Sequence, residues 1–155
     1  MKNNVLFLIL FFSFAINAQE LPKLPKDQMN SIKYEYNWKT EKFLIINYRF
    51  LAKDCSYDNY GELKKTYDWF NEFIYSKLDS TLFRSVFVYA DKLAAKEILD
   101  DQQNYADIGH YFLKNFFNQK NNCYGILVIN KIGNYKVILG DYSKKDVENM
   151  LEALK

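Results

Sequence analysis

The hydrophobic and polar positions of the chain follow two different periods, and each period predicts particular elements. Residues 42–50 form a dense apolar and β-branched run, which is typical of a central strand. Residues 32–38 alternate apolar and polar positions and predict an edge or half-buried strand. Residues 82–90 are again aromatic and β-branched and predict a third strand, after which Asp91 is placed to cap a helix over residues 94–101.

A helical period begins after residue 59. The apolar residues of this segment recur at i, i+4, i+7, i+11 and i+15, and they are Leu63, Tyr67, Phe70, Ile74 and Leu78. This spacing predicts a long amphipathic helix over residues 59–78. Helical spacing of four further apolar residues predicts another helix over residues 105–116.

The C-terminal part predicts a hairpin and a last helix. Gly133 and Asn134 separate two short apolar runs, and both residue types tolerate the positive φ angles of a tight turn. Ser143 and Asp146 are placed to cap a helix over residues 143–155. The order strand, strand, helix, strand, helix, hairpin, helix predicts an α/β fold, in which helices cover both faces of a mixed sheet.

The N-terminal segment has the plan of a secretory signal peptide over residues 1–18. A basic start is followed by an apolar run over residues 5–16 and a small residue, Ala18. We expect cleavage after Ala18, a periplasmic or secreted product, and no permanent membrane span, because a spanning helix needs about 20 apolar residues. Residues 19–31 carry both prolines and predict an extended linker, so that residues 32–155 form the folded domain.

Composition excludes several classes of function. The 155 residues carry 21 Lys and Arg against 19 Asp and Glu, so the net charge of +2 gives no reason to expect a nucleic-acid partner. No phosphate loop, dinucleotide fingerprint or metal-ligand spacing is present in the sequence, so we expect no cofactor and no metal. His110 is the only histidine and falls within the helix predicted over residues 105–116, away from the strand ends. Nucleophilic catalysis by a Cys-His pair is therefore not expected.

The two cysteines supply the candidate chemistry. Cys55 follows the central strand and precedes the long helix, where backbone N–H groups stabilise a thiolate. This strand, cysteine and helix over residues 43–73, with the hairpin and helix over residues 126–154, resemble the thioredoxin-like fold of the redoxin type. The resemblance covers residues 32–155, and it implies a thioredoxin-like three-layer sandwich with a mixed central sheet.

The chain departs from this family at its motifs. The CxxC dithiol of the family is CSYD at residues 55–58, so the resolving thiol is missing. Asp58 also places a negative charge near Cys55, which disfavours a thiolate. The Thr and Pro of peroxiredoxin-like relatives are replaced by Ala52 and Tyr48, which disfavours a peroxidase.

A second departure involves Cys123, which lies in the loop where the family usually carries a cis-proline. That loop faces the active-site loop in the family fold, so the resemblance implies a disulfide between Cys55 and Cys123. One possible function is a thiol-disulfide oxidoreductase, in which Cys55 exchanges with protein thiols or disulfides and Cys123 resolves the mixed disulfide. The alternative is a non-catalytic interaction domain with a structural disulfide and an unidentified envelope protein as partner. The binding residues expected around the cleft are Asp54, Tyr57, Asp58, Asn59, Tyr60 and Tyr124.

A third possibility comes from residues 105–140, where a helix, an Asn-rich turn and a hairpin follow one another. This order is similar to the C-terminal half of the TPM domain of exported proteins. The front half of that domain has no counterpart here, whereas residues 43–78 fit the thioredoxin-like plan. The TPM-like interpretation therefore ranks last.

Overall fold

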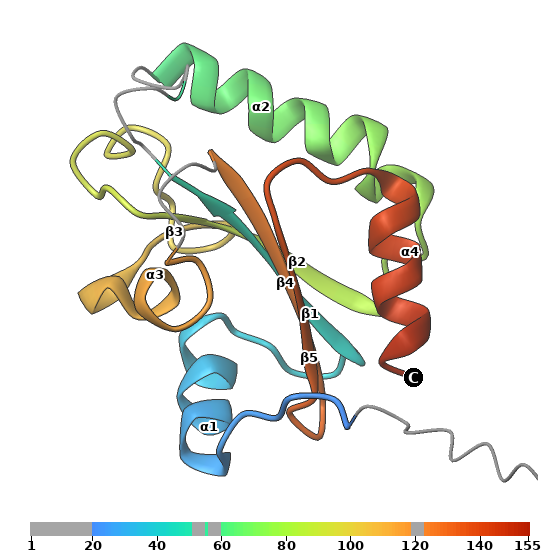
Figure 1. The fold of residues 1–155 in the computed structure, drawn as a ribbon. Helices are drawn as coiled ribbons and strands as arrows, with labels where there is room; N and C mark the ends of the chain where they lie inside the picture. Colours follow the sequence, from blue (N-terminus) through green and yellow to red (C-terminus); the bar gives the residue numbers. More distant parts are fainter. Residues whose placement is uncertain (1–19, 51–54, 56–59, 119–122) are drawn as a thin grey trace, which may run out of the picture.

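The computed structural model describes residues 20–50, 55, 60–118 and 123–155, so the predicted signal peptide lies outside the described residues. Within these ranges, no helix is both long and apolar enough to cross a membrane. Figure 1 shows the elements, which in chain order are α1 (Lys26–Glu35), β1 (Phe43–Arg49), α2 (Tyr60–Phe73), the 3₁₀ turn η1 (Tyr75–Lys77), β2 (Phe83–Tyr89), β3 (Asn104–Ala106), the 3₁₀ turn η2 (Ile108–His110), α3 (Tyr111–Asn115), β4 (Tyr124–Asn130), β5 (Tyr135–Leu139) and α4 (Lys144–Ala153).

The five strands form one mixed sheet in the order β3-β2-β1-β4-β5. Strands β1, β2 and β3 are parallel, whereas β4 is antiparallel to both β1 and β5. In the centre of the sheet, Ile46 pairs with Val86 on one side and with Leu127 on the other. All seven residues of β1 are buried, which explains its unbroken apolar run.

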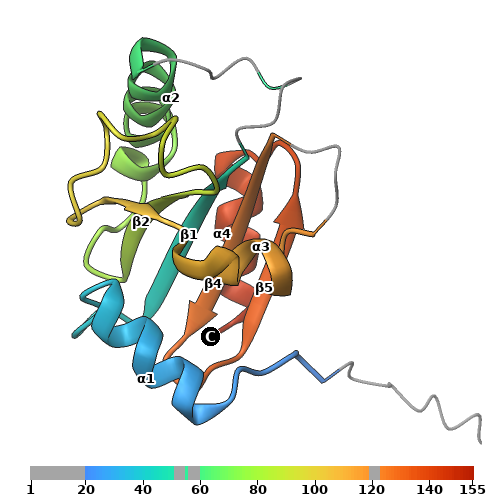
Figure 2. The same cartoon turned by 90° about the vertical axis from the view of Figure 1, so that its left-hand side faces the viewer.

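Helices cover both faces of this sheet, so the chain forms a three-layer α/β sandwich. Helices α2 and α4 lie on one face, and α1 and α3 lie on the other (Figures 1 and 2). Alternate residues of β1 enter two separate apolar clusters, as Ile45 packs in the α2/α4 layer and Leu44 packs in the α1/α3 layer. The predicted α/β class with a mixed sheet and helices on both faces is confirmed.

Several predicted elements are confirmed in detail. Strands β1 and β2 and the β4–β5 hairpin lie where the sequence pattern places them, and α2 begins as expected but ends at Phe73, before the 3₁₀ turn η1. Gly133 adopts a φ of 95° in the hairpin, which explains the need for a glycine there. Ser143 and Asp146 form a reciprocal capping box at the start of α4.

The region before β1 is helical and corrects two predictions. Residues from Lys26 onward form α1 instead of continuing the linker expected over residues 19–31, and the strand expected over residues 32–38 is wrong. Met29 and Ile32 are buried at helical spacing against the sheet. Burial of this face stabilises a helix in a segment whose local pattern also fits a strand.

The region between β2 and β4 also differs from the prediction. Residues 92–98 form consecutive turns instead of a helix, although the side chain of Asp91 accepts two backbone N–H groups as a cap does. The helix expected over residues 105–116 is shortened, because its start belongs to strand β3 and only α3 is helical. Gly109 and His110 both adopt positive φ angles, which interrupt the helix between these elements.

Candidate functional site at the carboxyl ends of the parallel strands

Strands β1, β2 and β3 run parallel, so their carboxyl ends meet at one edge of the sheet. Open α/β sheets bind ligands at this edge, near the strand where the direction of the chain connections changes. Here that strand is β1, because α2 leads from it to β2 on one side while β4 pairs with it on the other. The segment after β1 contains Cys55.

Cys55 and Cys123 form a disulfide, with their Cα atoms 5.4 Å apart, and they are separated by 68 positions in sequence. The predicted disulfide is therefore confirmed. Cys55 is 8% exposed and belongs to the apolar cluster of the α1/α3 face, while half-buried Cys123 packs against the same cluster. The backbone N–H of Phe50 donates to the carbonyl of Cys123 at 3.1 Å, so Cys123 and the disulfide lie where β1 ends and β4 begins.

The predicted binding residues are only partly described. Four of them lie outside the described residues, namely Asp54, Tyr57, Asp58 and Asn59. Tyr60 is the first residue of α2. Tyr124 is the first residue of β4, directly after Cys123, and its ring contacts the guanidinium of Arg49.

Arg49 is a site residue that the sequence reasoning missed. It ends β1 on the α2/α4 face and is 1% exposed. Its guanidinium lies 4.4 Å from the ring centre of Phe70 and 4.6 Å from that of Tyr124, and Nη1 donates to the carbonyl of Tyr48 at 3.0 Å. Among the described residues, no carboxylate lies within ion-pair distance of this guanidinium. Aromatic rings and a carbonyl therefore take the place of an anionic partner.

Neutral tyrosines surround the same position. The hydroxyl of Tyr142 donates to Oδ1 of Asn47 at 2.5 Å, and the hydroxyl of Tyr75 donates to the same oxygen. Burial raises the pKa of both tyrosines, although the charge of Arg49 acts in the opposite direction. Both hydroxyls therefore stay protonated at neutral pH and act as hydrogen-bond donors.

A hollow of about 380 Å³ opens beside this group, and we call it the α2 hollow. Its described lining residues come from α2, the start of β4 and the loop before α4, and they are Glu62, Lys65, Thr66, Trp69, Phe70, Tyr124, Asp141 and Tyr142. The rings of Phe70 and Tyr124 separate it from the guanidinium of Arg49.

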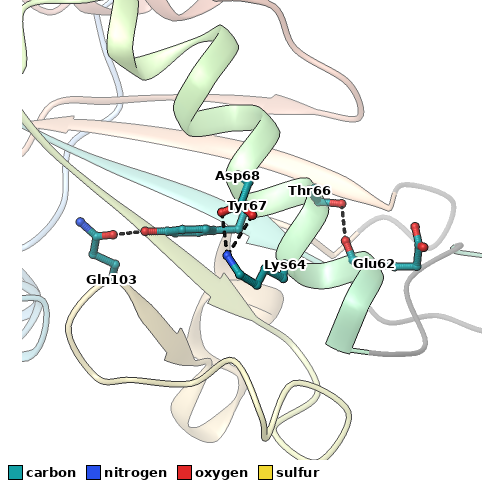
Figure 3. Close-up of polar contacts among 6 residues, drawn as sticks. All are labelled: Glu62, Lys64, Thr66, Tyr67, Asp68 and Gln103. Atoms are coloured by element: carbon teal, nitrogen blue, oxygen red, sulfur yellow. Dashed lines mark hydrogen bonds and ion pairs between the residues drawn. The ribbon is translucent and has the colours of Figure 1, made fainter.

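Polar contacts fix the helix that forms one wall of this hollow (Figure 3). Lys64 and Asp68 form an i, i+4 ion pair at 2.9 Å, and Thr66 Oγ1 donates to the carbonyl of Glu62 at 2.9 Å. The hydroxyl of Tyr67 donates to the side chain of Gln103, which ties α2 to the turn before β3. The α2 wall is thus anchored to the sheet edge.

A second hollow, of about 1150 Å³, lies above the carboxyl ends of β2 and β3. His110 lines it, together with Asp91 and exposed Leu93 and Ile108. The expected position of His110, within a helix and away from the strand ends, is wrong, because β3 ends only four residues before it. The turn at Gly109 and the short length of β3 produce this difference.

Asp107 fixes the loop that carries His110. Its carboxylate accepts hydrogen bonds from the backbone N–H groups of Phe112 at 3.0 Å and Leu113 at 2.9 Å, and from the hydroxyl of Tyr48 at 2.8 Å. These bonds satisfy the start of α3 and connect it to β1. Asp107 is therefore a buried structural anchor rather than an exposed reactive group.

Comparisons with protein-family models and with curated proteins give no match, so the class of protein is defined here by the structure alone. Within the described ranges, no group of three His, Cys, Asp or Glu side chains is arranged to hold a metal ion. The chain is a three-layer α/β domain, with a mixed five-stranded sheet and a disulfide at the carboxyl edge of its parallel strands.

Proposed function

We propose that the chain is an exported, non-catalytic binding domain of thioredoxin-like architecture, in which the disulfide between Cys55 and Cys123 is a structural staple. The observation that carries this proposal is the burial of Cys55, which is 8% exposed within the apolar cluster of the α1/α3 face. Exchange requires a partner thiolate to reach a sulfur of the bond, and burial restricts that approach.

The arrangement of elements supports the relation to the thioredoxin-like fold. The cysteine follows the central strand β1 and precedes the long helix α2, and the hairpin β4–β5 and helix α4 close the chain. This order agrees with what the resemblance in the sequence implies. The missing CxxC motif agrees with a binding role for the domain.

The position of the disulfide supports a stabilising role. It closes a long loop that contains α2, β2, β3 and α3, and the chain-entropy model gives about 4 kcal/mol of stabilisation for such a loop. It also covalently joins the segment that follows β1 to the residue that precedes β4, and these two strands are neighbours in the sheet. Such a bond persists in the oxidising compartment that a signal peptide implies.

Thiol-disulfide exchange is the second candidate, because Cys123 is half-buried rather than fully buried. In that case a thiolate of a protein substrate would attack the sulfur of Cys123 or Cys55, form a mixed disulfide and release the other cysteine as a thiolate. A second thiolate of the same substrate would then attack the mixed disulfide, so that the substrate leaves with a disulfide and the domain keeps both cysteines as thiols.

Incubation of the mature protein, residues 19–155, with reduced glutathione separates the two candidates. Mass spectrometry after acid quenching and alkylation counts mixed glutathione disulfides. We expect none in the native protein and rapid formation in urea, where the same bond is accessible. A glutathione adduct in the native protein would support exchange and contradict the staple.

A further inference from the structure

The α2 hollow is walled by aromatic rings that contact one another. The ring centres of Trp69 and Phe70 lie 5.0 Å apart, and those of Phe70 and Tyr142 also lie 5.0 Å apart. Tyr124 completes the wall, with its ring centre 6.3 Å from that of Phe70. The rings are inclined to one another, and together they offer an apolar aromatic surface to any ligand that enters the hollow.

Trp69 is the exposed member of this wall. The chain has two tryptophans; Trp38 is 3% exposed, whereas Trp69 is 48% exposed and lines the hollow. The indole of Trp38 donates to the carbonyl of Glu41 at 2.8 Å inside the fold. The indole ring of Trp69 is therefore accessible to a ligand that enters the hollow.

The charges around the hollow balance. Among the described residues, its lining contains the carboxylates of Glu62 and Asp141 and the ammonium of Lys65, which pairs with Glu62 at 2.7 Å. The fourth charge is the guanidinium of Arg49, directly behind the rings of Phe70 and Tyr124. Two positive and two negative groups therefore surround the aromatic wall.

This balance restricts the kind of ligand. A cation is disfavoured, because Arg49 already uses the inner faces of Phe70 and Tyr124 and repels a second positive charge. An anion is disfavoured by the carboxylate of Asp141, which is exposed. A purely apolar ligand would leave the charged groups of the rim without water or hydrogen-bond partners.

We propose that the α2 hollow binds a neutral sugar ring, whose C–H face stacks on Trp69 while its hydroxyl groups hydrogen-bond to the charged rim. Hydroxyl groups both donate and accept, so they satisfy carboxylate and ammonium groups together. The volume of about 380 Å³ suits one or two such rings. This site specifies the ligand class of the proposed binding domain and rests on that proposal.

Tryptophan fluorescence tests the site directly, because Trp69 is exposed and Trp38 is buried. The mature protein is titrated with maltohexaose, cellohexaose, xylohexaose and mannohexaose, each to about 10 mM, which covers millimolar dissociation constants. We expect a saturable change with at least one of them. Choline and hexagalacturonate serve as cationic and anionic comparators and are expected to give none.

Variants then locate the binding, measured by calorimetry. Trp69→Ala is expected to weaken the affinity for the binding sugar by about tenfold or more. Tyr34→Ala is the matched control, because Tyr34 is an exposed aromatic residue of α1 on the opposite face of the sheet, and it is expected to change the affinity by less than about twofold. If Trp69→Ala does not fold, Asp141→Ala tests the same hollow from an exposed loop.

Several outcomes would overturn the proposal: no response to any of the four sugars, a response to choline or hexagalacturonate alone, or equal losses of affinity in the Trp69 and Tyr34 variants. A negative titration leaves the glutathione experiment unaffected. A glutathione adduct, conversely, would contradict the non-catalytic role and leave the sugar titration valid.

Discussion

The two faces of the sheet bury opposite charges, and they hold them differently. On the α1/α3 face, the carboxylate of Asp107 is 6% exposed and accepts three hydrogen bonds of 2.8–3.0 Å. On the α2/α4 face, the guanidinium of Arg49 lies between aromatic rings and donates to the carbonyl of Tyr48 at 3.0 Å and to the hydroxyl of Tyr142 at 3.5 Å. The α1/α3 face also contains the disulfide, whereas the α2/α4 face borders the α2 hollow.

The loops of the α1/α3 face are therefore held in fixed positions, whereas the surroundings of Arg49 on the α2/α4 face are more adaptable. Directional hydrogen bonds and a covalent bond fix the loops of the α1/α3 face, and each lost partner there leaves a buried donor unsatisfied. Ring contacts with a cation are less directional, so the α2/α4 face tolerates more change around its charge. The predictions below test this contrast.

The largest effect is expected at alkaline pH and involves both faces. Burial raises the pKa of Tyr36 and Tyr48 on one face and of Tyr75 and Tyr142 on the other. Unfolded tyrosine ionises near pH 10 while these residues stay protonated in the fold, so their stability contribution is complete below pH 10 and decreases above it. Above pH 10, we expect each of these tyrosines to lower the free energy of unfolding by about 1.4 kcal/mol per pH unit.

Absorbance at the tyrosinate band and far-ultraviolet circular dichroism, followed together during a pH titration, measure this effect. The protected tyrosines should ionise only as the protein unfolds. Ionisation of all tyrosines with native circular dichroism would contradict their burial.

Removal of the disulfide should have the next largest effect. Cys55→Ser combined with Cys123→Ser is expected to lower the free energy of unfolding by about 4 kcal/mol, because the unfolded chain regains the entropy of the closed loop. Urea denaturation measures the change, and reduced wild-type protein serves as the control. A loss below about 1 kcal/mol would show that the bond is not a staple.

The third largest effect is expected for Asp107→Ala. We expect it to lower the free energy of unfolding by about 3 kcal/mol, because it leaves two backbone donors and one hydroxyl without their acceptor. Asp91→Ala is the matched control, since that carboxylate also accepts two backbone N–H groups but is exposed. Its expected loss is about 1 kcal/mol. Equal losses in urea denaturation would remove the distinction between the buried and the exposed carboxylate.

Arg49→Met should have the smallest effect. We expect it to lower the free energy of unfolding by less than about 1.5 kcal/mol, because an apolar side chain of similar length fills the space without a buried charge. Arg49→Lys should cost more, about 2 kcal/mol, because an ammonium is more strongly hydrated and cannot stack on the rings. Urea denaturation of both variants gives the order. A larger loss for Met than for Lys would show that the charge itself stabilises this face.

The elements that the sequence predicted well are those whose burial matches a simple period. Helix α2 buries Leu63 and Phe70 on one stripe, and β1 is buried on both faces. Helix α1 was misread because Tyr34 and Tyr36 alternate with polar residues as in a strand, yet Tyr34 is exposed and Tyr36 is buried with Ile32 one turn earlier. Strand β3 has three residues, too few for any period to show.

The site was only partly predictable for a related reason. The disulfide followed from a family resemblance that places two distant loops together. The sequence reasoning missed Asn47 and Arg49, whose partners come from segments far apart in sequence, such as Phe70 and Tyr142. Such contacts depend on the packing of layers, which local patterns do not contain.

The reduction potential of the bond between Cys55 and Cys123 tests the central claim most directly. The mature protein is equilibrated in buffers of thiol-disulfide couples, and alkylated thiols are counted by mass. A structural staple predicts a potential below about −300 mV. A value between about −120 and −230 mV would place the bond among exchange-active disulfides and contradict the account.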